Sequence, residues 1–355
     1  GSYILGMINA AGLASVLVLF FLGDRLNKFL VIGVALLIFT LSLGTASYAP
    51  TYGLLLAVFF LFGLGIKTFD TMNNAVISDL HEKKRGLLLN LMHAGFSVGA
   101  LLSPQYVLLL EENGYPWTSA FYFFGAGSLA ALLLYLAVLS LSRRRLSRRT
   151  QPPTEAPVQT KSLSTVLEVA KSGKLWFLAL VFFSVFGVIS LVNTWLVYHF
   201  EVGIGSSRTI AKGAVTAFWI GVLLSRTVVA PIAIRVGSLR FIAVSSVVAA
   251  LVVATALGVG EPYFIVVGIF VTGLVSGQIN PFVIANSVAI FPGRSAAVSA
   301  LLFLIAYISQ IFFPWFSGLL GEAFSSTVTM MMIPVSFVLV SLFTYLVVYM
   351  NRREA

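Results

Sequence analysis

Long apolar stretches, separated by short polar ones, follow one another along nearly the whole chain. A helix needs about 20 mostly apolar residues to cross a hydrocarbon core of ~30 Å, and eleven stretches come close to this length. They are residues 3–22, 29–47, 53–78, 87–110, 118–141, 174–200, 209–234, 241–259, 263–289, 295–320 and 328–350. The pattern therefore predicts an all-α, polytopic membrane protein with eleven spans.

The polar positions of the first half recur in the second half at a constant offset. Arg25 and Arg235 lie 210 positions apart, and the same offset relates Asp70 to Asn280. One offset that holds across several spans indicates two homologous helical bundles. The span at 174–200 has no counterpart, because its equivalent would precede the first residue. We therefore expect the chain to begin at the second helix of a twelve-helix protein.

Composition and charge narrow the class of protein. With 59% apolar and 10% charged residues, the chain does not have the composition of a soluble domain. The net charge is +10, but 18 of the 22 Lys and Arg residues lie in one alternate set of connections. The positive-inside rule places those connections in the cytoplasm. We expect a multi-pass protein of the plasma (inner) membrane with a cytoplasmic C-terminus, in contact with membrane lipid and without a nucleic-acid partner.

One connection is much longer than the others. Residues 142–173 hold an Arg cluster and then a Pro-rich stretch, a composition that cannot bury a core. We expect three parts: an N-terminal bundle at 1–141 with helices two to six, a cytoplasmic linker at 142–173, and a C-terminal bundle at 174–355 with helices seven to twelve. We expect the protein to be a monomer.

Motifs for catalysis or metal binding are missing from the sequence. There are no cysteines, and we find no phosphate-binding loop, H-E-x-x-H motif or G-x-S-x-G motif. We therefore expect no catalytic residues, no cofactor and no metal site, and we do not expect an enzyme.

The first polar connection carries a family signature. Residues 23–28 read Gly-Asp-Arg-Leu-Asn-Lys, which resembles the loop motif G-x-x-x-D-R-x-G-R-R of the major facilitator superfamily. The chain departs from this motif at Phe20, Asn27 and Phe29. The resemblance implies that Asp24 and Arg25 form a gate, in which the carboxylate meets the start of the eleventh helix and is stabilised by the helix dipole. The alternative is an ordinary solvated pair in a loop.

A narrower resemblance covers most of the chain. It is similar to fucose permease-like sugar:cation symporters, and this implies uptake of a monosaccharide coupled to H⁺ or Na⁺. The matching residues are Gly63 and Gly65, Asp70-Thr71-x-x-Asn74, Leu89-Asn90-Leu91-Met92-His93, Ser97-x-Gly99-Ala100, Pro104, Trp195, Tyr198, Trp219, Gly221 and Arg226.

Three ionisable residues lie near the middle of predicted spans: Lys67, Asp70 and Arg226. A charge at the bilayer centre costs about 2.5–3.5 kcal/mol even on insertion scales, so such residues usually face a partner or an aqueous cavity. Lys67, Asp70 and Asn74 share one helical face because they are spaced i, i+3, i+7. We expect Asp70, with Lys67, to couple a proton or cation to transport. The alternative is a static ion pair that fixes helix packing.

Other polar residues fit the binding of a sugar, whose hydroxyl groups need neutral amides and whose apolar face needs an aromatic ring. Arg226 has two open interpretations: it binds substrate, or it locks the structure by pairing with carbonyl groups at a helix end. Hydrogen bonds between helices are the alternative for each amide. The expected substrate-binding residues are Asn74, Asn193, Trp195, Arg226, Gln278, Asn280, Tyr307 and Gln310.

The leading hypothesis is a secondary transporter that works by alternating access on a small-molecule substrate, with cation-coupled uptake of a sugar. An organic anion transporter, by H⁺-coupled symport or exchange, is the alternative, because Lys67 and Arg226 outnumber Asp70 among the mid-span charges. A membrane scaffold that transports nothing is the third hypothesis.

Overall fold

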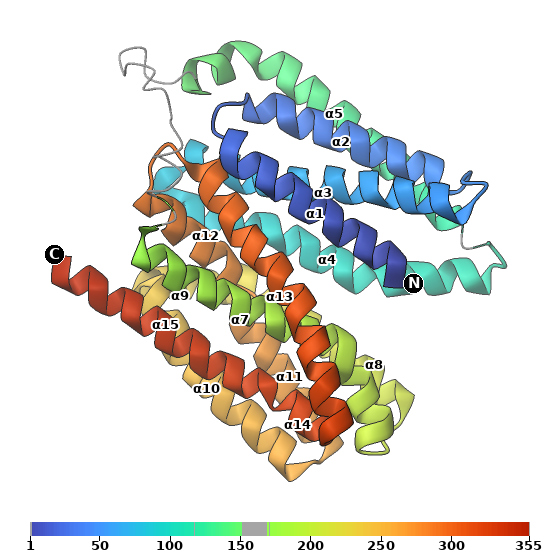
Figure 1. The fold of residues 1–355 in the computed structure, drawn as a ribbon, viewed down its shortest axis with the longest axis vertical. Coiled ribbons are helices and arrows are strands. Elements are labelled where there is room, and N and C mark those ends of the chain that lie inside the picture. Colours follow the sequence, from blue (N-terminus) through green and yellow to red (C-terminus); the bar gives the residue numbers. More distant parts are fainter. Residues whose placement is uncertain (1, 117, 151–168, 170, 355) are drawn as a thin grey trace. The chain divides into compact units, whose positions relative to one another are not determined.

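A computed structural model describes residues 2–116, 118–150, 169 and 171–354, which are almost entirely helical (Figure 1). The helices of the first half are α1 (Ser2–Leu22), α2 (Lys28–Ala46), α3 (Tyr52–Leu80), η1 (Glu82–Lys84), α4 (Arg85–Glu112) and α5 (Ser119–Thr150). Those of the second half are α7 (Gly173–Tyr198), η2 (His199–Gly203), α8 (Arg208–Leu224), η3 (Ser225–Val229), α9 (Ala230–Val236), α10 (Ser238–Val259), α11 (Pro262–Ser276), α12 (Ile279–Ile290), α13 (Ser295–Ala323), α14 (Ser326–Met330) and α15 (Met332–Glu354).

Ten helices of the described part are long and apolar enough to cross a membrane. The first predicted span corresponds to α1, whose apolar part, Gly6–Leu22, is shorter. The prediction of an all-α polytopic membrane fold is therefore confirmed. Helix α5 continues to Thr150, beyond the predicted end of its span at 141. Most of the predicted linker, residues 151–168 and 170, lies outside the described residues.

The chain forms two compact units. Unit 1 comprises residues 1–82, 104–171 and 291–304, and unit 2 comprises residues 83–103, 172–290 and 305–355. Two helices are therefore divided between the units: residues 85–103 of α4 lie in unit 2 and its end in unit 1, whereas residues 295–304 of α13 lie in unit 1 and its remainder in unit 2. The division into two bundles at 1–141 and 174–355 rests on the sequence repeat and stays a prediction.

In unit 1, α3 packs against α1 and α2, and α2 also packs against α5 (Figure 1). Two glycines of α3 permit this close packing. A Cβ atom at Gly65 would lie 2.7 Å from the backbone nitrogen of Phe39 on α2. A Cβ atom at Gly63 would lie 2.8 Å from the carbonyl oxygen of Ile8 on α1. Small residues let helix backbones approach in this way in membrane bundles.

In unit 2, α8 packs against α11, and α15 packs against both α7 and α10. Two predicted spans are interrupted here. The span at 209–234 contains a π-helical turn, η3, and the span at 263–289 breaks at Gly277 and Gln278. The two irregular segments are bonded to each other, because the backbone N–H of Gln278 donates to Ser225 Oγ at 3.0 Å. Such π-turns and broken helices frequently mark functional positions.

Candidate functional site

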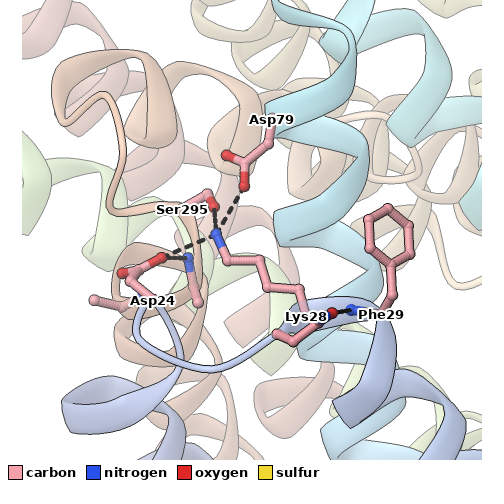
Figure 2. A network of polar contacts seen from close by, with 8 residues as sticks. Asp24, Lys28, Phe29, Asp79 and Ser295 are labelled. Atoms are coloured by element: carbon pink, nitrogen blue, oxygen red, sulfur yellow. Dashed lines mark hydrogen bonds and ion pairs between the residues drawn. The ribbon is translucent and has the colours of Figure 1, made fainter. Parts of the chain in front are cut away.

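Asp24 lies in the short connection between α1 and α2, at the start of α13 (Figure 2). Its two carboxylate oxygens accept hydrogen bonds from the backbone N–H groups of Ala296 and Ala297, each at 3.0 Å. These N–H groups belong to the first turn of α13, where no intrahelical acceptor is available. The connection reaches this position because residue 23 is glycine: a Cβ atom there would lie 2.8 Å from the Cβ of Ala296.

Lys28, the first residue of α2, completes this network. Its Nζ lies 3.0 Å from Asp24 Oδ1, 2.7 Å from Asp79 Oδ2 at the end of α3, and 2.7 Å from Ser295 Oγ (Figure 2). Asn27 caps α2, because its Oδ1 accepts from the backbone N–H groups of Phe29 and Leu30. The cap fixes the backbone that carries Lys28.

The electrostatics of this network favour a closed contact between the α1–α2 connection and α13. The side chain of Asp24 is only 9% exposed, and that of Lys28 is 16% exposed. A carboxylate at a helix N-terminus gains from the helix dipole, and its hydrogen bonds are charge-assisted. Arg25, which was predicted to act with Asp24, is exposed in the turn. The gating role of both residues stays a prediction.

The residues predicted to couple a cation lie on α3 in unit 1. The amide of Asn74 donates to the carbonyl oxygen of Asp70 at 2.8 Å and to Asp70 Oδ1 at 3.2 Å. Lys67 lies one turn before Asp70 and interacts with it electrostatically. Asn74 is fully buried, whereas Lys67 and Asp70 are half-buried. Lys67, Asp70 and Asn74 therefore interact with one another on the predicted helical face, and the Asp70 carboxylate accepts at least one hydrogen bond.

Arg226 lies in the π-turn η3 of unit 2 and is only 5% exposed. Its Nε donates to the carbonyl oxygen of Gly277 at 2.9 Å, at the break between α11 and α12. Its Nη1 donates to the carbonyl oxygen of His93 at 2.6 Å and to Ser97 Oγ at 2.7 Å, both on α4. These contacts are of the kind expected for the structural lock, and substrate binding by Arg226 stays a prediction.

Gln278 and Asn280 lie at the break between α11 and α12. Both side chains are buried, and neither amide atom of Gln278 has a hydrogen-bond partner among the described residues. The Oδ1 atom of Asn280 is likewise unpartnered there. A buried polar atom without a partner costs about 1–3 kcal/mol, so such atoms usually serve a ligand, an ion or water. On α13, Tyr307 is buried and Gln310 is half-buried, with its amide 3.4 Å from the Ala306 carbonyl oxygen.

Trp195 and Asn193 lie on the second half of α7. The indole N–H of Trp195 donates to Ser317 Oγ at 2.7 Å, and its ring packs edge-on against Tyr198 at 5.4 Å between centroids. The ring also lies directly against Gly321, so a Cβ atom at that position would clash with the ring. Asn193 is exposed. Trp195 therefore has a fixed ring orientation, which an aromatic binding surface requires.

Several residues of the site were not predicted from the sequence: Lys28, Asp79, Ser295, Ser97 and Ser225. One signal was available for Lys28, which occupies a basic position of the loop motif G-x-x-x-D-R-x-G-R-R. Ser97 belongs to the stretch Ser97-x-Gly99-Ala100 that resembles the sugar:cation symporters. Asp79, Ser225 and Ser295 carry no comparable signal, because serines and single aspartates are common near helix ends.

Comparison with known proteins identifies the family. The sequence profile of the Major Facilitator Superfamily matches residues 2–211. No curated protein matches the chain. The fold is similar to the E. coli fucose:proton symporter FucP (TM-score 0.76, 15% identity, covering 97% of this chain and 91% of that one). It is also similar to the proton:xylose symporter XylE (TM-score 0.73, 14% identity, 97% and 85% covered) and to the human organic anion transporter MFSD10 (0.74, 15%, 97% and 82%). Because the profile match covers more than half of the chain, the protein belongs to the Major Facilitator Superfamily, whose members are transporters and not enzymes.

Proposed function

We propose that the protein is a secondary active transporter that takes up a sugar together with H⁺ or Na⁺ by alternating access. It acts in the plasma membrane, with its C-terminus in the cytoplasm and substrate bound near mid-membrane. The family and the fold support a transporter, and two of the structures with a similar fold are sugar:proton symporters.

The observation that carries the cation-coupling proposal is the polar group on α3. Asp70 is a carboxylate within a membrane-spanning helix, next to the cation of Lys67 and bonded by the amide of Asn74. Desolvation favours the neutral carboxyl, whereas a nearby cation and a hydrogen-bond donor favour the carboxylate. A change in these surroundings during transport therefore shifts the balance between binding and releasing a cation. This is the property that coupling requires.

The buried amides of unit 2 support a neutral, hydroxyl-rich substrate. Gln278 offers a donor and an acceptor without partners among the described residues, and Asn280 offers an acceptor. A sugar hydroxyl both donates and accepts, so it satisfies such amides. Trp195, with its ring held by Ser317, provides an aromatic surface for the apolar face of a sugar ring. Asn74, Asn193, Tyr307 and Gln310 complete the proposed substrate-binding set.

Transport of an organic anion is the second candidate, and Lys67 is the residue that favours it. The human organic anion transporter MFSD10 has a similar fold. The contacts of Arg226 weaken this candidate, because two backbone carbonyl groups and Ser97 already accept hydrogen bonds from its guanidinium. An anion site would then depend chiefly on Lys67.

The test uses the protein reconstituted in liposomes, with uptake of radiolabelled fucose, xylose and glucose and competition by unlabelled sugars and carboxylates. Sugar-driven movement of H⁺ or Na⁺ is measured in the same vesicles. We expect competition by sugars and none by carboxylates. We expect Asp70→Asn to abolish sugar-driven ion movement while sugar exchange across the membrane persists.

Glu201→Gln is the matched control, because Glu201 is a carboxylate at the end of the α7 span, where it pairs with Arg208. It should leave ion movement unchanged. Ion movement that persists in Asp70→Asn would remove Asp70 from the coupling role. Competition by carboxylates alone would replace the sugar proposal with the anion proposal, and the absence of any uptake or binding would favour the scaffold hypothesis.

A further inference from the structure

Helix α4 begins in unit 2 and ends in unit 1. Alternating access moves the two repeats of a transporter relative to each other. By the predicted division into repeats, α4 belongs to the first repeat, but its residues 85–103 lie in the compact unit that holds most of the second repeat. The contacts of residues 85–103 in unit 2 are therefore contacts that the transport cycle has to break and remake.

Arg226 supplies the hydrogen bonds from η3 to the first turns of α4. Its Nη1 binds the His93 carbonyl oxygen and Ser97 Oγ, at 2.6 and 2.7 Å. Helix α4 also makes apolar contacts in unit 2: the Phe96 ring lies 5.8 Å from that of Trp219, and the Gly86 position faces the Phe282 ring. Apolar contacts slide more readily than directed, charge-assisted hydrogen bonds between buried groups.

The other end of the same guanidinium holds the helix break. Arg226 Nε binds the carbonyl oxygen of Gly277, directly before Gln278. Helices α8 and α11 are fixed to each other here, because Ser225 Oγ accepts from the Gln278 N–H and a Cβ at Gly277 would lie 2.8 Å from the Val222 carbonyl oxygen. One planar side chain therefore connects α4 to the break that carries the proposed substrate-binding amides.

We infer that Arg226 is a positioning residue that couples the break between α11 and α12 to the release of α4. In this proposal, a substrate that binds Gln278 or Asn280 shifts the Gly277 carbonyl group. The shift moves the guanidinium and weakens its hydrogen bonds to the His93 carbonyl oxygen and Ser97 Oγ. This inference rests on the proposed function, since it gives Arg226 a task in the same transport cycle. A guanidinium is required because its planar fork reaches several acceptors at once, which an ammonium group cannot do.

The sequence contains no cysteine, so a single introduced thiol reports on α4. Ala285 on α12 is buried at 7% exposure, and a Cβ at Gly86 of α4 would lie 3.9 Å from its Cβ. In the Ala285→Cys protein, the rate of reaction with a membrane-impermeant maleimide measures release of α4. The reagent is applied in inside-out vesicles, without substrate.

We expect Arg226→Lys to raise this rate about tenfold, because the bonds to α4 are lost while the charge is kept. Ser97→Ala removes one acceptor and should raise it about threefold. Arg240→Lys, an exposed basic residue of α10, is the matched control and should change it less than about twofold. Unchanged rates in both Arg226→Lys and Ser97→Ala would overturn the inference.

A second thiol distinguishes release of α4 from general loosening of the fold. Asn193→Cys places an exposed thiol on the half of α7 that the positive-inside rule assigns to the outside. Release of α4 as part of alternating access should slow labelling there from the outside, whereas loosening should speed labelling at both positions. Faster labelling at both would assign Arg226 a purely structural role. Both assays work without substrate, so failure of the sugar proposal leaves this test intact.

Discussion

Replacing Asp24 with asparagine tests whether the network in Figure 2 holds the start of α13 in place. The substitution keeps the shape of the side chain and removes its charge. Asparagine offers one acceptor oxygen to the N–H groups of Ala296 and Ala297, where the carboxylate offers two. Its amide also loses the attraction to Lys28. We expect the α1–α2 connection to release α13 more often.

The size of the effect follows from the contacts. Asp24 accepts two backbone hydrogen bonds at 3.0 Å with only 9% of its side chain exposed. A hydrogen bond to a charged group contributes about 1.5–3 kcal/mol, and a neutral one about 0.5–1.5 kcal/mol. In Asp24→Asn one of these hydrogen bonds is lost and the other is weakened, and the partly exposed Lys28 adds little. The contact between the α1–α2 connection and α13 should therefore be weaker by about 2–3 kcal/mol. This corresponds to a shift of roughly 30- to 150-fold in the equilibrium.

The assay again uses the absence of native cysteines. Ala297→Cys places a thiol in the first turn of α13, where the native side chain is 6% exposed, and keeps the backbone N–H that Asp24 binds. Its labelling from the side of the membrane on which the α1–α2 connection lies should be faster in Asp24→Asn by the factor above, up to the limit set by a freely exposed thiol. Glu82→Gln, an exposed carboxylate of η1, is the control. If Asp24→Asn and Glu82→Gln label within about twofold of the parent, the network does not hold α13.

Two further predictions concern stability and are measured by thermal unfolding in detergent. Gly65→Ala should destabilise the protein by about 1–3 kcal/mol, because the new Cβ would lie 2.7 Å from the Phe39 nitrogen. Gly44→Ala is the control and should not destabilise it, because a Cβ at Gly44 would meet nothing within 4 Å among the described residues. An equal effect of both would contradict the close packing of α2 and α3. Asn27→Ala should lower stability by about 1 kcal/mol through loss of the α2 cap, and Asn27→Gly by only a few tenths; the reverse order would show that the cap contributes nothing.

The helices could be predicted from the sequence because the hydrocarbon core imposes their length. The predicted span at 295–320 corresponds to α13 at Ser295–Ala323, and the others agree as closely at most ends. Internal irregularities could not be predicted in this way. At the break near Gly277, the backbone N–H of Gln278 donates a hydrogen bond to Ser225 Oγ, which lies 53 positions away in the sequence. An apolar pattern records which residues are buried and contains no information about backbone hydrogen bonds between helices.

The candidate site shows the same limit. Lys67, Asp70 and Arg226 could be selected because charges are rare in apolar stretches, and Asp24 because it matches the loop motif. The partners of charged residues could not be selected in this way, because they can lie far away in the sequence: Ser295, for example, meets Lys28 across 267 positions. The sequence left two interpretations of Arg226 open, because its acceptors, two backbone carbonyl groups and Ser97 Oγ, lie on other segments of the chain.

Helices α4 and α13 are each divided between the two compact units, so a cut between the two halves of the chain should affect both fragments. A fragment of residues 1–150 carries residues 85–103 of α4 but lacks the groups of unit 2 on which they pack. A fragment of residues 169–355 carries the start of α13 but lacks the groups of unit 1 on which it packs. Neither piece contains all of the helices of one compact unit. Covalent order and packing order thus disagree over residues 83–103 and 291–304, so the two fragments should accumulate in a membrane only when a cell makes both.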